Sequence, residues 1–245
     1  RRGDLTFEVG LHEMDGLSPR DMKTKIFNDL GVFKQVEFIP LQEFYRFING
    51  RYDIVVPNNS EKAAAQLSKL FPGETKGITE YFNLLLNPPK KNEKNEMQDS
   101  SIGEFLDSVF TDEDLKLILL GNLGYFADDP YSLSLAYYAA AQGSYYSGGS
   151  CYIKGGSQKL SDYLAAFIRD NGGEVILNHL VTGIKTKDGK ICGVFYRKKN
   201  DKQDILFEAE ADNLIANNSV AGVADLMPPD HGPVLKDHIS GMENG

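Results

Sequence analysis

Several features that mark common protein classes are absent from this chain of 245 residues. It has no run of about 18 apolar residues, so the sequence predicts no membrane-spanning helix. Positive charge is scarce: 26 lysines and arginines face 35 aspartates and glutamates, and the net charge of −9 argues against a nucleic-acid partner. Cys151 and Cys192 are too few for a disulfide framework, which is typical of a cytoplasmic protein.

Motifs for several common site chemistries are also missing. His179, His231 and His238 have no cysteine or carboxylate at ligand spacing, so no metal site is expected. The nucleophile elbow G-x-S-x-G does not occur. Neither a P-loop nor the dinucleotide fingerprint G-x-G-x-x-G is present. The chain alone is therefore not expected to hold the phosphates of a nucleotide.

The first 150 residues combine strand patterns with a long helical stretch. Residues 35–57 read as strands, and Asn49-Gly50 predicts a hairpin turn between two of them. Helical periodicity follows, with Ser60 at the expected N-cap of the first of these helices. Ser101 and Glu104 match a capping box before another helix. The middle of the chain is thus expected to be mostly helical.

The pattern after residue 150 is more regular. A helix with an apolar stripe ends at Gly172-Gly173, and residues 174–187 then read as a strand. Asp188-Gly189 predicts a tight turn into a returning strand, and residues 213–218 a final buried strand. This order predicts a mixed α/β (α+β) fold that contains a β-meander.

The glycine-rich stretch "SYYSGGSCYIKGGSQKLSDYL", residues 144–164, admits two interpretations. It can form two tight turns around a short strand, or, as the family resemblance described below implies, it can let the backbone approach a flat ligand that any Cβ would displace. Ser157 is the expected N-cap of the next helix, where free N–H groups could bind an anion weakly.

Several stretches together carry a family resemblance. They are "FEVGLHEMDGL" near the start, "KLFPGETKGITEYFNLL", "SLSLAYYAAAQGSYYSGGSCYIKGGSQKL", "GKICGVFYR" and "ADNLIANNSVAGVADLMP". Their order and spacing resemble the phytoene desaturase, carotenoid isomerase and retinol saturase family of flavoproteins. In that family a glycine-rich FAD fingerprint lies upstream, and a second flavin-contacting stretch lies near the C-terminus. Both are missing here, so the resemblance implies a fragment.

The resemblance also implies a domain organisation. Residues 1–34 would form an edge of the FAD-binding domain, and residues 35–146 a substrate-binding and cap domain. Residues 147–228 would return to the FAD-binding domain. Residues 229–245 would be a tail or the start of the missing C-terminal region. The missing N- and C-terminal parts of the same protein are then expected partners.

The implied function is that of an FAD-dependent oxidoreductase. It would transfer hydride between flavin and C–H or C=C bonds of a hydrophobic polyene or isoprenoid. With an incomplete FAD site, this chain is expected to be inactive by itself. Two alternatives stay open: flavin-dependent cis–trans isomerisation of a carotenoid, and a non-catalytic lipid-binding module. A cap helix lying on a membrane would add peripheral membrane contact to a cytoplasmic location.

The resemblance points to individual residues, each with a structural alternative. Val181 follows Glu174 and Val175 at the spacing that the family uses, and its backbone would pair with the adenine of FAD. The alternative is that Val181 is an ordinary buried valine of a strand. His12 is the weak candidate for a catalytic proton relay, or a structural histidine. The aromatic run 125–146 would line a substrate tunnel or fill the core. The remaining candidates are, for the cofactor, Gly10, Gly155, Gly156, Asn217 and Asn218, and, for the substrate, Tyr152 and Lys154.

Overall fold

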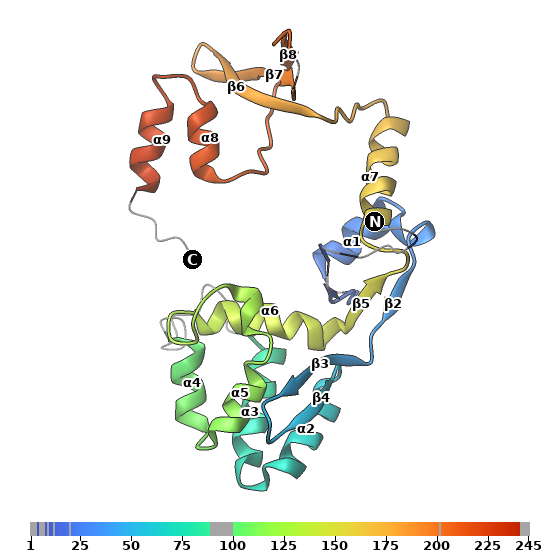
Figure 1. The fold of residues 1–245 in the computed structure, drawn as a ribbon, viewed down its shortest axis with the longest axis vertical. Coiled ribbons are helices and arrows are strands. Elements are labelled where there is room, and N and C mark those ends of the chain that lie inside the picture. The colour runs from blue at the N-terminus through green and yellow to red at the C-terminus, as the bar shows by residue number, and fades with distance from the viewer. Residues whose placement is uncertain are drawn as a thin grey trace. The chain divides into compact units, whose positions relative to one another are not determined.

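The computed structural model describes residues 4, 8, 10–11, 13–19, 21–88, 100–200 and 202–240. The chain divides into two compact units, Arg1–Gly172 and Gly173–Gly245. Helices and antiparallel strands occur in both units, so the mixed α/β fold expected from the sequence is confirmed (Figure 1).

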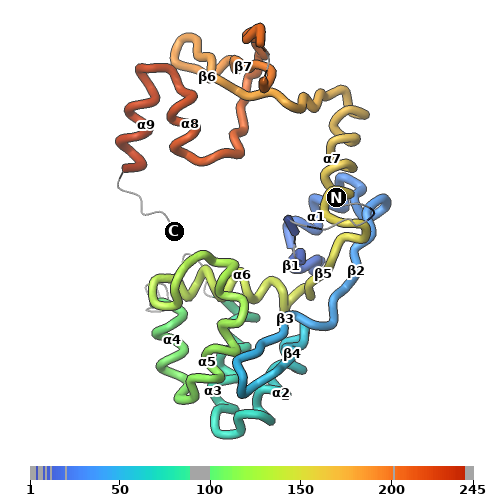
Figure 2. Tube along the Cα trace, in the orientation of Figure 1, coloured from blue at the N-terminus to red at the C-terminus, as the bar shows by residue number. Residues whose placement is uncertain are grey.

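The first unit contains a small sheet, a hairpin and a group of helices (Figure 2). In chain order its elements are β1 (Met14–Asp15), α1 (Met22–Asp29), the 3-10 helix η1 (Val32–Lys34), β2 (Phe38–Pro40), β3 (Glu43–Ile48), β4 (Asp53–Pro57), α2 (Ser60–Leu70), η2 (Pro72–Glu74), α3 (Thr75–Leu86), α4 (Ile102–Val109), α5 (Glu113–Leu119), η4 (Leu123–Phe126), α6 (Leu135–Gly148), β5 (Ser150–Ile153) and α7 (Gln158–Asp170).

The small sheet joins distant parts of the chain. Its order is β1-β5-β2 with antiparallel pairing, and Cys151 on the central strand faces Met14 on one side and Pro40 on the other. Ile153 is buried against η1, and Leu160 and Leu164 of α7 pack against the same cluster. The apolar period of α7 therefore attaches the helix to this sheet, as the sequence pattern indicates.

The β3–β4 hairpin confirms the predicted Asn49-Gly50 turn. Gly50 has a φ of +83°, which suits glycine, and the side-chain oxygen of Asn49 accepts hydrogen bonds from the N–H groups of Arg51 and Tyr52. The hairpin lies against the start of α5, because Asn49 and Arg51 both bond to Asp114.

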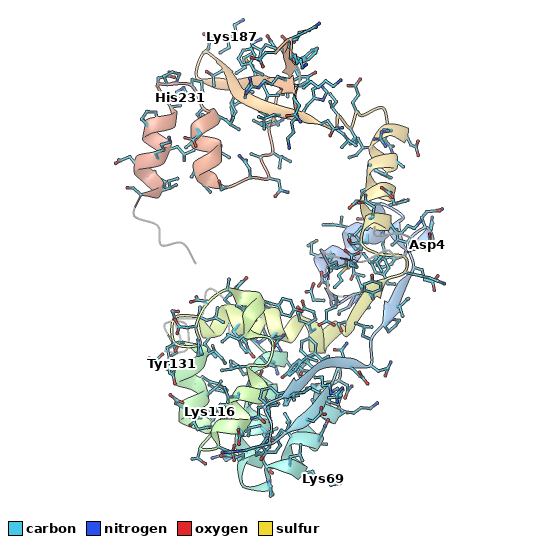
Figure 3. The ribbon with its side chains drawn as sticks, in the orientation of Figure 1. Asp4, Lys69, Lys116, Tyr131, Lys187 and His231 are labelled. Atoms are coloured by element: carbon cyan, nitrogen blue, oxygen red, sulfur yellow. The ribbon has the colours of Figure 1, made fainter. Side chains whose placement is uncertain are left out.

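The helices α2 to α6 form the main apolar core with the hairpin (Figure 1). At its centre the Tyr81 and Tyr138 hydroxyl groups are hydrogen-bonded to each other at 2.8 Å, and the Tyr138 hydroxyl lies 3.0 Å from the carbonyl of Leu119 at the end of α5. Outside this core, Lys116 and Tyr131, labelled in Figure 3, both bond to Asp107 of α4.

Helix starts agree with the sequence in one case and shift by one residue in another. Ser101 and Glu104 form the predicted capping box, with hydrogen bonds in both directions. The N-cap of α2 is Asn59 rather than Ser60. Its side chain accepts the N–H of Lys62, and Ser60 becomes the first helical residue.

The second unit is a β-meander with two helices. Its elements are β6 (His179–Lys187), β7 (Lys190–Lys198), β8 (Leu206–Glu210), α8 (Val220–Leu226) and α9 (Gly232–Ile239). The predicted Asp188-Gly189 turn is confirmed by φ values of +51° and +74°. Two strand predictions are wrong in extent. The strand expected at 174–187 begins only at His179, and residues 213–218 form no strand in the described chain.

Candidate functional site

A cavity of about 690 Å³ lies in the first unit beside the β3–β4 hairpin. It is bounded by the residue before β1, the start of β3 and the turn after α5. The wall residues used below are Glu13, Phe44, Tyr45, Arg46, Asn122 and Tyr125. The cavity is therefore built from three separate segments of one unit, whose relative positions the small sheet and the hairpin fix.

Aromatic rings form much of the cavity wall. Phe44 is buried, and the centre of its ring lies 5.1–5.2 Å from the ring centres of Tyr45, Tyr145 and Tyr146. The Tyr45 hydroxyl donates to the carbonyl of Ile118 at 2.6 Å, which fixes the ring. Burial raises the pKa of Tyr45, so it is a neutral hydrogen-bond donor at pH 7.

Polar groups enter the same wall. Glu13 is only 8% exposed, and Asn122 is also buried. The amides of Asn122 and Gln142 exchange two hydrogen bonds, of 2.9 and 3.2 Å, so Asn122 is held in one orientation. Desolvation raises the pKa of Tyr125, and the negative charge of Glu13 raises it further. The cavity thus combines apolar rings with a buried carboxyl group.

An ion pair lies next to Glu13 on β1. Lys23 donates to the side chain of Asp15 at 2.8 Å and to its backbone carbonyl at 2.7 Å. Desolvation alone would raise the pKa of Asp15, but hydrogen bonds from Lys23 and Ser144 outweigh it and the pKa is lowered. Asp15 is therefore ionised at pH 7. Together with desolvation, its charge raises the pKa of Tyr145 to about 12.

The glycine-rich stretch packs mainly against the chain itself. A Cβ on Gly148 would lie 2.5 Å from the Cα of Gly16, so this glycine lets the chain directly after β1 pass against the end of α6. Gly155 and Gly156 have φ values of +81° and +93° and form the turn between β5 and α7. The interpretation as tight turns around a short strand is confirmed.

A carboxylate of the protein occupies the start of α7. Glu8 accepts the N–H of Ser157 at 2.6 Å, the Ser157 hydroxyl at 3.0 Å and the N–H of Gly10 at 3.0 Å. These bonds lower the pKa of Glu8 from 4.5 to about 2. Ser157 takes the N-cap position, as expected, but its side chain makes no capping bond. The carboxylate of Glu8 therefore takes the place at the start of α7 where the sequence suggested weak anion binding.

Five of the predicted site residues that the structure describes lie in the first unit. Gly10 and Gly156 come together at Glu8, because a Cβ on Gly156 would lie 3.0 Å from the Glu8 carboxylate. Tyr152 pairs with Ile39 within the small sheet. Lys154 extends to the surface and forms an ion pair of 2.8 Å with Glu37. None of Gly155, Tyr152 and Lys154 belongs to the wall of the 690 Å³ cavity.

The other predicted cofactor residues lie in the second unit. Val181 is 40% exposed on β6, opposite Tyr196, and β6 is an edge strand of the three-stranded meander. Asn217 and Asn218 are exposed and precede Ser219, which caps α8. A second cavity, of about 1070 Å³, lies between the β6–β7 hairpin, whose Lys187 is labelled in Figure 3, and residues 210–215.

The remaining sequence predictions have mixed outcomes. His12 lies outside the described residues. The aromatic run 125–146 splits, because Tyr138 is core whereas Tyr125 lines the cavity. Within the described ranges, no three His, Cys, Asp or Glu side chains gather as metal ligands would.

Sequence reasoning missed Glu8, Glu13 and Asn122. For Glu13 the available signal was a charged residue directly after His12, and for Asn122 an asparagine between two nearby glycines in "GNLG".

Comparison with known proteins identifies the family. The model of the flavin-containing amine oxidoreductase family matches residues 1–237, nearly the whole chain. The chain therefore belongs to this family, whose members contain a flavin. Among curated proteins, no sequence match was found.

Solved structures support the fold. An oxidoreductase from Methanosarcina mazei superposes with a TM-score of 0.69 at 17% identity, covering 96% of this chain and 54% of that one. A Rab GDI from Plasmodium falciparum superposes with a TM-score of 0.46 at 15% identity, covering 91% of this chain and 49% of that one. The chain thus spans about half the length of these two structures.

No helix in the described part of the chain is long and apolar enough to cross a membrane.

Proposed function

We propose that this chain is part of an FAD-dependent oxidoreductase that transfers hydride between flavin and C–H or C=C bonds of a hydrophobic polyene or isoprenoid. The observation that carries the proposal is the aromatic-walled cavity of about 690 Å³ in a chain of the flavin-containing amine oxidoreductase family. Phytoene desaturase-like chemistry is the particular form that the sequence resemblance suggests.

The cavity wall suits a flat apolar ligand. Phe44 and Tyr45 extend from adjacent positions of β3, and their ring planes are inclined at 57°. Such rings offer large contact area at low cost in side-chain entropy, because their positions are already fixed by packing and by the Tyr45 hydrogen bond. The protein's part in the reaction would be to position the substrate and exclude water.

The second unit fits a role beside the cofactor. When bound, the flavin would supply the redox chemistry. Because β6 is a sheet edge, alternate backbone N–H and C=O groups along it point away from β7, as pairing of Val181 with an adenine requires. Asn217 and Asn218 have exposed side chains that can donate and accept hydrogen bonds.

Further parts of the same protein are proposed to complete the site. Leu177 is 69% exposed and Ile215 is 96% exposed, although both belong to apolar segments. Exposed apolar segments of this kind mark contact surfaces. Because the chain spans about half of the oxidoreductase it superposes on, the N- and C-terminal parts of a longer protein are the proposed cover. Peripheral contact of the protein with a membrane, which the sequence resemblance implies, is a further proposal.

The test is an absorbance spectrum of the 245-residue chain and of the full-length gene product, each with added FAD. Flavin bands near about 370 and 450 nm in the full-length protein, and none in this chain, would support a cofactor site completed by other segments. Bands in neither protein would contradict the flavoenzyme proposal and favour a lipid-binding module. Incubating the flavin-loaded protein with a polyene then separates a change in double-bond number from cis–trans isomerisation.

A further inference from the structure

The chain turns sharply just before β6. Asn178 has a φ of +59°, in the left-handed region that asparagine tolerates better than most residues. Its backbone carbonyl accepts the N–H of Lys199, the residue after β7, at 2.7 Å. An extended strand cannot continue back through a residue in this conformation, so β6 begins only at His179.

The side chain of His179 closes this turn. Its Nδ1 atom lies 2.8 Å from the backbone carbonyl oxygen of Leu177, on the other side of Asn178. Because a carbonyl oxygen only accepts hydrogen bonds, Nδ1 carries a proton in this contact. The bond therefore joins the first residue of β6 to the segment that precedes the turn.

The same imidazole ring belongs to an aromatic cluster on the meander. Its centre lies 5.6 Å from the ring centre of Tyr196 on β7 and 5.9 Å from that of Phe207 on β8, both in edge-to-face geometry. The Tyr196 and Phe207 rings are stacked, with their centres 5.5 Å apart. Aromatic pairs at these distances stabilise a fold beyond the area that they bury. The two neighbouring strands thus hold the ring of His179 in place.

Val181 lies two residues further along this edge strand. After Val181 the pairing with β7 shifts, and Thr182 is the extra residue of a β-bulge. Bulges redirect the groups of a strand and are over-represented next to functional sites. The backbone at Val181 is therefore set by the His179 contact on one side and by a bulge on the other.

We propose that His179 is a positioning residue for the flavin cofactor. Through its bond to the Leu177 carbonyl it fixes the β6 edge, so that the backbone of Val181 can pair with the adenine of FAD. This inference rests on the proposed function, in which Val181 pairs with the adenine, and it adds a residue that acts through the backbone without touching the cofactor. The atom that matters is Nδ1, and the ring contacts alone do not suffice.

The test measures the dissociation constant of FAD for the full-length protein and three variants, by titrating the flavin-free protein and following the flavin absorbance. His179→Asn keeps an N–H group close to the place of Nδ1, His179→Gln moves the amide toward the place of Nε2, and His179→Phe keeps only a ring. We expect His179→Asn to stay within about twofold of the unmodified protein. His179→Gln and His179→Phe should bind FAD about three- to tenfold more weakly, as expected for the loss of one hydrogen bond.

His238→Phe is the matched control, because His238 is an exposed histidine of α9 in the same unit. It should leave the dissociation constant unchanged. Equal FAD affinity of His179→Asn and His179→Gln would overturn the proposal, and this comparison decides even if His179→Phe fails to fold. Binding of FAD to His179→Phe as tightly as to the unmodified protein would overturn it as well.

A failure of this inference is distinguishable from a failure of the proposed function. FAD binding by the unmodified protein, with no effect of the three substitutions, would reject the role of His179 alone. No FAD binding by the unmodified protein would reject the proposed function, and this inference with it.

Discussion

Glu8 supplies the negative charge at the start of α7. Its carboxylate accepts hydrogen bonds from Ser157 and Gly10, which holds the segment before β1 against the β5–α7 turn. A free helix start with several N–H groups attracts anions. Here that position is filled by the Glu8 carboxylate, and the glycine at 156 allows its close approach.

The Glu8 contact predicts a stability difference that depends on pH. The folded-state pKa, about 2, lies below the usual 4.5, so the stabilisation is present above pH 4.5 and is lost as pH falls toward 2. Glu8→Gln should lower the urea midpoint at pH 6, and the difference from the unmodified protein should shrink below pH 4.5. Glu80→Gln, at an exposed position of α3, is the control. A difference that stays constant down to pH 3 would exclude this account.

Gly121 lines the cavity, and the Tyr45 ring leaves no room for a side chain at this position. A Cβ at this position would lie 2.5 Å from the Tyr45 ring, which cannot swing away without breaking its bond to Ile118. Gly121→Ala should therefore lower the free energy of unfolding by about 1–3 kcal/mol. Gly124→Ala is the matched control three residues later, where a Cβ would meet nothing within 4 Å. Its unfolding free energy should stay equal or rise by up to about 1 kcal/mol.

Urea unfolding followed by far-UV circular dichroism measures both variants. Equal effects of the two substitutions would show that the Tyr45 ring adapts freely, in contradiction to its fixed position.

The capping box at Ser101 determines where α4 begins. Ser101→Ala removes the bond from its hydroxyl to the Glu104 N–H and should cost about 1 kcal/mol of unfolding free energy. Ser108→Ala removes a hydroxyl from the same helix that only donates to the Phe105 carbonyl, so its effect should be under about 0.5 kcal/mol. Thermal unfolding of both variants is the measurement. A larger loss in Ser108→Ala would contradict the assignment of the cap.

The elements that the sequence predicts well are those determined by local chemistry. The Asn49-Gly50 and Asp188-Gly189 turns need positive φ values, and Ser101 with Glu104 satisfies its own helix start, so short stretches contain the whole signal. The apolar segments 174–178 and 213–218 read as strands, but a strand forms only when a neighbour accepts its hydrogen bonds. Within the described residues neither segment pairs with another strand.

The candidate site was predictable only in part, because it depends on contacts distant in sequence. Glu13 is buried since β1 joins β5, more than 130 positions away, and no local pattern indicates that pairing. The close packing of Gly148 against Gly16 likewise joins segments more than 130 positions apart, and the glycine-rich stretch does not indicate it locally. Recognising a flavin-containing protein from the order of several motifs was possible, since that order does not depend on knowing the contacts, whereas the phytoene desaturase-like specificity stays a prediction.

At the scale of the whole molecule, the exposed apolar segments of the second unit lead to the last prediction. If other parts of a longer protein pair with residues 174–177 and 213–216, amide hydrogen exchange there should be roughly tenfold slower or more in the flavin-loaded full-length protein than in this chain. The β6–β7 turn at Asp188-Gly189 is the internal control, since its hydrogen bonds lie within the hairpin. Mass spectrometry of peptic fragments resolves both regions. Equal exchange in the two proteins would mean that these segments stay uncovered, and the proposed completion of the site would then be wrong.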